Sequence, residues 1–137
     1  ELINIGTDNL LKKMKNEKLK KSLPSEQLSY TARAYLKFSL EEKELFSLMF
    51  SKKNLEIKKL IDSISSQFLD IVKEKFKDGS RVRVTEKGAS MTAWAMIHGL
   101  AKLAGNDNLE EIEKNVELKF EEIFNQMSAI WGKGVAN

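Results

Sequence analysis

The stretch NLEIKKLIDSISSQFLDIVKEKFK (54–77) carries the strongest periodic pattern in the chain. Its apolar residues recur at steps of three and four, the spacing that places side chains on one face of an α-helix. Asp78-Gly79 follows, and glycine readily adopts the left-handed conformation that ends helices. The stretch therefore predicts one long amphipathic helix packed against others. Its apolar face consists of Ile57, Leu60, Ile61, Ile64, Phe68, Ile71, Val72 and Phe76.

Upstream, the pattern predicts two further helical segments. Residues 2–21 have a loose helical spacing that Gly6 interrupts, which indicates one or two helices. Pro24 marks the next start, because proline fits the first turn of a helix and not its interior. The helix after Pro24 places Leu28, Ala32, Tyr35 and Ser39 on one line.

Two sites have the spacing of a capping box, in which a polar residue is followed three positions later by Glu. Ser39 with Glu42 predicts a short helix that starts near residue 40 and carries Leu45, Phe46, Leu48, Met49 and Phe50. Asn108 with Glu111 predicts the start of a final helix at about 109–131, ahead of a frayed tail that contains Gly132-Lys133-Gly134. The stripe of this final helix contains Leu109, Ile112, Val116, Phe120, Ile123, Met127 and Ile130, widened by Leu118, Phe124 and Trp131.

The helix expected from about Thr85 or Glu86 to Ala104 is unusual, because it is apolar on nearly every side. The preceding residues 81–84 alternate like a strand but are too short and isolated for a sheet, so we expect a loop there. A helix that is apolar all round must be covered all round. It should lie at the centre of a bundle or be covered by a partner subunit. Together the patterns predict an all-α bundle of about six helices in one domain, 1–137.

Composition excludes most catalytic and metal chemistry. The 137 residues contain no cysteine and one histidine, so thiolate and multi-histidine metal sites and a cysteine nucleophile are excluded. No phosphate-binding or hydrolase motif occurs, and the paired carboxylates lie on polar faces. We expect no enzyme, cofactor or metal, and we interpret His98 as a core histidine. The alternatives for this residue are ligand contact, a pH-sensitive interface, or catalysis in an enzyme that has a nucleophile or carboxylate within hydrogen-bond reach of the imidazole. A net charge of +3 does not by itself indicate nucleic-acid binding.

Aromatic and methionine side chains are the most prominent remaining feature. Core packing explains most of them, but such residues also line adaptable pockets between bundle helices. The candidates for a ligand pocket are Tyr35, Phe38, Phe46, Met49, Phe50, Phe68, Met91, Trp94 and His98.

Two segments resemble a known family. ARAYLKFSLEEKELFSLMF (32–50) and MTAWAMIHGLAKL (91–103) are similar to the C-terminal domain of tetracycline-repressor-type (TetR) transcriptional regulators. The subgroup is the one named for a Trp, a His and a Gly in its central helix, here Trp94, His98 and Gly99. The resemblance covers nearly the whole chain and includes the aromatic positions Tyr35, Phe38, Phe46 and Phe50. Glu42-Lys43 departs from it, because the family often has a His-Pro pair there.

The resemblance implies a homodimer in which the last two long helices form a four-helix bundle, with a pocket for a small hydrophobic effector in each subunit. Effector binding would release operator DNA, which only an upstream helix-turn-helix module would contact. The chain starts at Glu1 without Met, and we expect that module upstream of it. The candidates for the dimer interface are Ile97, Leu100, Ala101, Phe120, Ile123, Phe124, Met127, Ile130 and Trp131.

The competing hypothesis is a helical interaction or structural domain without a small-molecule ligand, whose aromatic side chains only fill a core. No apolar run reaches the roughly 18–20 residues that cross a bilayer, so we expect no membrane partner. With no secretory signal, the cytoplasm is the expected location.

Overall fold

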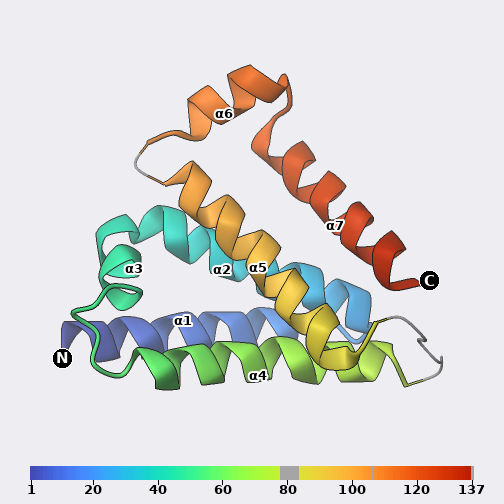
Figure 1. Cartoon of the computed structure of the whole chain (residues 1–137), viewed down its shortest axis with the longest axis horizontal. Helices are drawn as coiled ribbons and strands as arrows, with labels where there is room; N and C mark the ends of the chain where they lie inside the picture. The colour runs from blue at the N-terminus through green and yellow to red at the C-terminus, as the bar shows by residue number, and fades with distance from the viewer. Residues whose placement is uncertain (78–83, 106, 137) are drawn as a thin grey trace.

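The computed structural model describes residues 1–77, 84–105 and 107–136. Within these ranges the chain forms seven α-helices and no strand (Figure 1), so the predicted all-α class is confirmed. The helices are α1 (Leu2–Lys18), α2 (Pro24–Glu41), α3 (Lys43–Met49), α4 (Ile57–Lys75), α5 (Glu86–Ala104), α6 (Leu109–Val116) and α7 (Phe120–Ala136).

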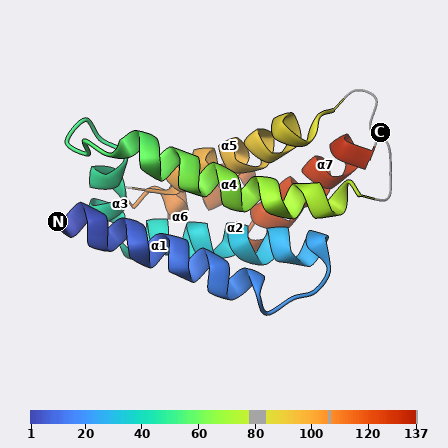
Figure 2. The same ribbon diagram turned by 90° about the horizontal axis from the view of Figure 1, so that it is seen from below.

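Helix α2 forms the centre of the bundle, because it packs against α1, α3, α4 and α5. It begins at Pro24, as the sequence predicts. Helices α1 and α4 lie side by side on one face of the molecule (Figure 2), and Gln67 Nε2 donates a hydrogen bond to the carbonyl oxygen of Leu11 between them at 3.1 Å. The buried residues of α2 are Leu28, Thr31, Ala32, Ala34, Tyr35, Leu36, Phe38 and Ser39.

Helix α1 runs without a break through Gly6, so residues 2–18 form one helix. The glycine is required by packing. A Cβ atom built at Gly6 would lie 2.8 Å from Cδ2 of Leu45 in α3, closer than real Cβ atoms approach another carbon. The residue that suggested an interruption of the helix therefore allows α1 and α3 to approach each other.

The predicted capping box at Ser39 is wrong. Helix α2 continues past this residue to Glu41, so Ser39 lies inside the helix and not at a helix start. Its Oγ donates to the carbonyl oxygen of Leu36 at 2.7 Å, a local bond that competes with capping. Helix α3 begins instead at Lys43, without a side-chain cap.

Helix α5 begins where the sequence predicts, and Thr85 Oγ1 accepts a hydrogen bond from the N–H of Gly88 at 3.0 Å. Val84 is not in a strand; residues 81–83 and the predicted stop Asp78-Gly79 lie outside the described residues. One side of α5 packs on α2 and α4. The other side leaves Met91 55% and Leu103 65% exposed, so the expected central position belongs to α2 and not to α5.

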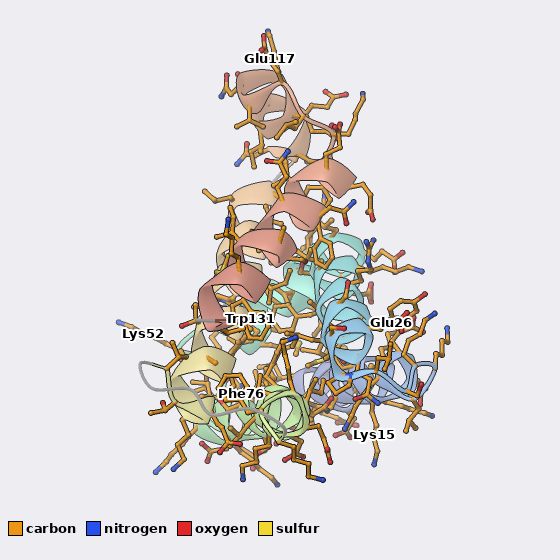
Figure 3. All side chains as sticks on the ribbon, turned by 90° about the vertical axis from the view of Figure 1, so that its right-hand side faces the viewer. Lys15, Glu26, Lys52, Phe76, Glu117 and Trp131 are labelled. Atoms are coloured by element: carbon orange, nitrogen blue, oxygen red, sulfur yellow. The ribbon has the colours of Figure 1, made fainter. Side chains whose placement is uncertain are left out.

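The predicted final helix, 109–131, is two helices. The chain turns at Glu117, which has a left-handed backbone with φ of 57°. Two carboxylates then bond the first N–H groups of α7: Glu122 Oε1 accepts from Lys119 at 3.0 Å, and Glu113 Oε2 accepts from Phe120 at 2.7 Å. Glu117 lies at the apex of this connection, away from the rest of the bundle (Figure 3). Helix α7 continues through the glycines of the expected tail to Ala136.

Candidate functional site

A hydrogen-bonded network of three side chains lies between α2 and α5. Trp94 Nε1 donates to the phenolic oxygen of Tyr35 at 3.1 Å, and that hydroxyl lies 2.5 Å from Nδ1 of His98. The Tyr35 hydroxyl and the Nδ1 atom of His98 share one hydrogen bond, whose direction depends on the tautomer of the imidazole. The rings of Phe46 and Phe50 pack around the imidazole, with centroids 5.7 and 4.8 Å from its own.

The electrostatics keep this network neutral. Burial raises the pKa of the Tyr35 phenol above its usual value of 10.0. Burial, with a smaller contribution from the positive charge of Lys102, lowers the pKa of His98 below 6.5. Both groups are uncharged at neutral pH. Among the described residues Tyr35 is the one hydrogen-bond partner of the imidazole, and no carboxylate orients it for proton transfer. The network has the character of a satisfied polar core.

The candidate ligand site is a cavity of about 290 Å³ between α2, α4, α5 and α7. Its wall is mostly apolar, with three serine hydroxyls and one lysine. Figure 3 faces the end of the molecule where these helices converge, marked by Glu26 in α2, Phe76 beside the end of α4, and Trp131 in α7. The lining residues are Ser25, Leu28, Ser29, Ala32, Phe68, Lys75, Ala93, Met96, Ile97, Phe124, Met127, Ser128, Ala129, Trp131 and Gly132.

Helix α7 forms one wall of this cavity and is joined to the bundle by polar contacts at both ends. Trp131 Nε1 donates to the carbonyl oxygen of Ala89 in α5 at 3.1 Å. At the other end, the Arg33 guanidinium lies 4.5 Å from the ring centroid of Phe124, donates to Asn125 Oδ1 at 3.1 Å and forms an ion pair with Glu121. These contacts hold α7 in place as one wall of the cavity.

The predicted pocket residues are distributed over several places. Phe68 lines the cavity, whereas Met91 and Trp94 line a separate hollow between α4 and α5. Phe38 lines a charged hollow between α1 and α2. Tyr35 and His98 belong to the polar network, and Phe46 and the half-buried Phe50 pack against its imidazole. Met49 is buried in the core.

Most of the residues that line the cavity were not among the predicted pocket residues, because that prediction was based on large aromatic and methionine side chains. The small residues Ala32 and Ala93 leave room between facing helices, and Ser25 and Ser29 repeat at a four-residue step on α2. Small side chains on otherwise apolar helix faces were the available signal.

The predicted interface residues fall into two groups. The structure buries Ile97, Leu100, Ala101, Phe124 and Trp131 within the chain itself, and three of these five, Ile97, Phe124 and Trp131, line the cavity. Along α7, Ile130 is 67% exposed, while Phe120, Ile123 and Met127 are half-buried. The steps of four and three from Ile123 to Met127 and Ile130 place these three side chains on one face of the helix.

The described residues contain no group of three or more His, Cys, Asp or Glu side chains that could hold a metal ion. None of the described helices is both long and apolar enough to cross a membrane.

Comparisons with known proteins agree with this architecture. The family described as "Tetracyclin repressor-like, C-terminal domain" matches residues 28–127. A solved structure of a protein of unknown function from Rhodococcus sp. RHA1 superposes with a TM-score of 0.81 at 20% sequence identity, covering 99% of this chain and 70% of that one. The comparison with curated proteins gives no match. The family match covers most of the chain, including all of α4 and α5, most of α2 and the first part of α7, and families of this kind are regulatory and not enzymatic. The chain therefore belongs to the tetracycline repressor-like C-terminal domain family.

Proposed function

We propose that the chain is the effector-binding and dimerisation domain of a TetR-type transcriptional repressor that acts in the cytoplasm. The apolar cavity between α2, α4, α5 and α7 carries this proposal. Most of its lining is apolar, with few polar groups, which is the usual composition of a small-molecule site. In the full-length protein, effector binding would release operator DNA held by a separate DNA-binding domain.

The packing of α2 supports a route from the cavity to that domain. Leu28 and Ala32 of α2 line the cavity, and α2 also packs along α1. The family resemblance implies that α1 is the helix that connects this domain to the DNA-binding module. An effector that displaces α2 would shift α1, and with it the spacing of the two DNA-reading modules in a dimer.

A second copy of the chain is the proposed partner for α6 and α7. Helix α6 has no buried residue, although Leu109, Ile112 and Val116 follow a helical stripe. Ile130 on α7 is exposed beside the half-buried Met127. These apolar side chains lie on consecutive helices, and a symmetric dimer would cover them.

The effector site is tested by filling the cavity. Ala93→Phe places a ring in the cavity, and Ala95→Phe is the matched control, because Ala95 is exposed on the same helix. The probe is the neutral dye N-phenyl-1-naphthylamine, followed by its fluorescence. We expect the wild type and A95F to bind the dye alike and A93F to bind at least about tenfold more weakly. Equal binding by A93F would favour the interaction domain without a ligand.

The dimer is tested by sedimentation velocity at tens of micromolar. We expect the wild type to sediment as a dimer and Ile130→Glu as a monomer, because a carboxylate on this face would be buried in the interface. Leu55→Glu is the control, since Leu55 is 95% exposed in the connection between α3 and α4. A wild type that stays monomeric at this concentration contradicts the proposed dimer.

A further inference from the structure

The wall of the cavity has an uneven charge, because it contains one lysine and no acidic residue among the described lining residues. Lys75 belongs to the last turn of α4 and is half-buried. Its neighbour Lys77 lies 3.1 Å from the carboxylate of Glu74, so the nearest acidic residue in the sequence is already paired. Among the described residues Lys75 has no ion-pair partner.

The acidic residue on the first turn of α2 is also paired outside the cavity. Glu26, on the first turn of α2, lies 3.6 Å from the ammonium of Lys21 and does not line the cavity. The cavity therefore has a net positive wall. A cationic ligand would find no carboxylate there among the described residues.

Three hydroxyls line the same cavity. Ser25 and Ser29 lie one turn apart at the start of α2, and Ser128 lies on α7. Ser128 Oγ already donates to the carbonyl oxygen of Phe124 at 3.0 Å, which leaves the two serines of α2 as the available donors. Figure 1 shows the start of α2 and the end of α4 at the same end of the molecule, and Lys75, Ser25 and Ser29 from these segments line the same cavity.

The apolar residues make up the rest of the wall, with Phe68, Ile97 and Phe124 among those most deeply buried. Lys75 is the one charged side chain among the described lining residues, and a wholly apolar ligand would leave this charge without a counterion. An anionic group on the ligand would pair with it through charge-assisted hydrogen bonds.

We propose that the effector is a small amphipathic monocarboxylate, whose carboxylate binds Lys75 with the serines of α2 and whose apolar body fills the space beside Phe68, Ile97 and Phe124. This rests on the proposed function, because it assigns the chemistry of the same cavity. A cavity of about 290 Å³ is at the small end of ligand pockets, so the apolar body is short.

The test compares three probes that share one chain and differ in headgroup: octanoate, octan-1-ol and octylammonium, titrated by calorimetry at pH 7. Lys75→Met removes the charge and keeps the length of the side chain. Lys73→Met is the matched control, since Lys73 is exposed on the same turn and does not line the cavity. We expect octanoate to bind most tightly and K75M to weaken octanoate by about tenfold to hundredfold, the effect of losing a charged hydrogen bond. Octanol binding should not change in K75M, and no probe should change in K73M.

Two results would overturn the carboxylate assignment. In the first, octanol or octylammonium binds as tightly as octanoate. In the second, K75M and K73M weaken octanoate equally, which would indicate attraction by the overall surface charge. If either result occurs while the neutral dye still binds the wild type and fails to bind A93F, the proposed effector site stands. Only the assignment of a carboxylate effector is then refuted. If neither the dye nor any octyl probe binds the wild type, both proposals fail.

Discussion

Replacing Tyr35 by Phe tests the polar network between α2 and α5. The change removes one oxygen atom and keeps the ring, which is fully buried and packs edge-on against Phe46 at 5.5 Å between centroids. It removes the acceptor of the Trp94 N–H and the hydrogen-bond partner of His98 Nδ1 at the same time. Packing is unchanged, so the loss of stability measures the hydrogen bonds.

The expected loss follows from the burial of the two partners. An unsatisfied buried polar group costs about 1 to 3 kcal/mol. Trp94 is 7% exposed, so little water can reach its N–H, whereas half-buried His98 recovers part of its loss by binding water. We expect Tyr35→Phe to lower the free energy of unfolding by about 2 to 4 kcal/mol, which for a domain of this size lowers Tm by roughly 6 to 14 °C.

The assay is thermal and urea unfolding followed by circular dichroism. Tyr30→Phe is the matched control, because Tyr30 lies on the same helix and its hydroxyl is not part of the network. The control should change Tm by less than about 2 °C, as surface substitutions usually do. If Tyr35→Phe changes Tm no more than the control, the indole and the imidazole do not depend on the phenol, and the network described above is wrong.

Three further changes have defined outcomes. Burial holds the pKa of His98 below 6.5, so near and below that pH the unfolded chain takes up a proton that the folded chain does not. The free energy of unfolding should therefore be greatest above pH 6.5 and fall below it by at most about 1.4 kcal/mol per pH unit. Urea unfolding measures this slope, and His98→Gln should remove it. Gly6→Val should lower the free energy of unfolding by about 1 to 3 kcal/mol, because the new side chain would press on Leu45. Gly99→Ala should raise it by up to about 1 kcal/mol in the same assay, because a Cβ at Gly99 meets nothing within 4 Å. Thr31 Oγ1 is buried without a hydrogen-bond partner among the described residues, so Thr31→Val should raise Tm, and a lower Tm would indicate a hydrogen bond at this hydroxyl.

Helix starts with a specific chemical cause could be predicted from the sequence. Pro24 and Thr85 begin α2 and α5 because a fixed φ angle and a capping hydroxyl act locally. The turn at Glu117 could not be predicted, because no glycine or proline marks it and the apolar stripe continues across it. The carboxylates of Glu113 and Glu122 stabilise that break, one of them from seven residues away in the sequence.

The family resemblance could be recognised from the motif residues, yet the motif does not mark the cavity. Trp94 and His98 belong to a satisfied polar network with Tyr35. The cavity forms where the small side chains of Ala32 in α2 and Ala93 in α5 line the space between the helices. The way α2 and α5 cross decides this position, and residue type alone does not. Dimerisation through α7 and the sites of effector contact stay predictions.

The position of α7 has a kinetic consequence. This helix forms one wall of the cavity and follows α6, which has no buried residue. It is held by the buried side chains Phe124, Trp131 and Val135, by the Arg33 contacts and by the bond from Trp131 to Ala89. Segments with few buried contacts open before the rest of a protein does. The amide hydrogens of α6 and α7 should therefore exchange with solvent faster than those of α2 and α4. Opening of α7 would remove one wall of the cavity, so the residence time of a ligand would be limited by the opening rate of one helix and not by unfolding of the bundle.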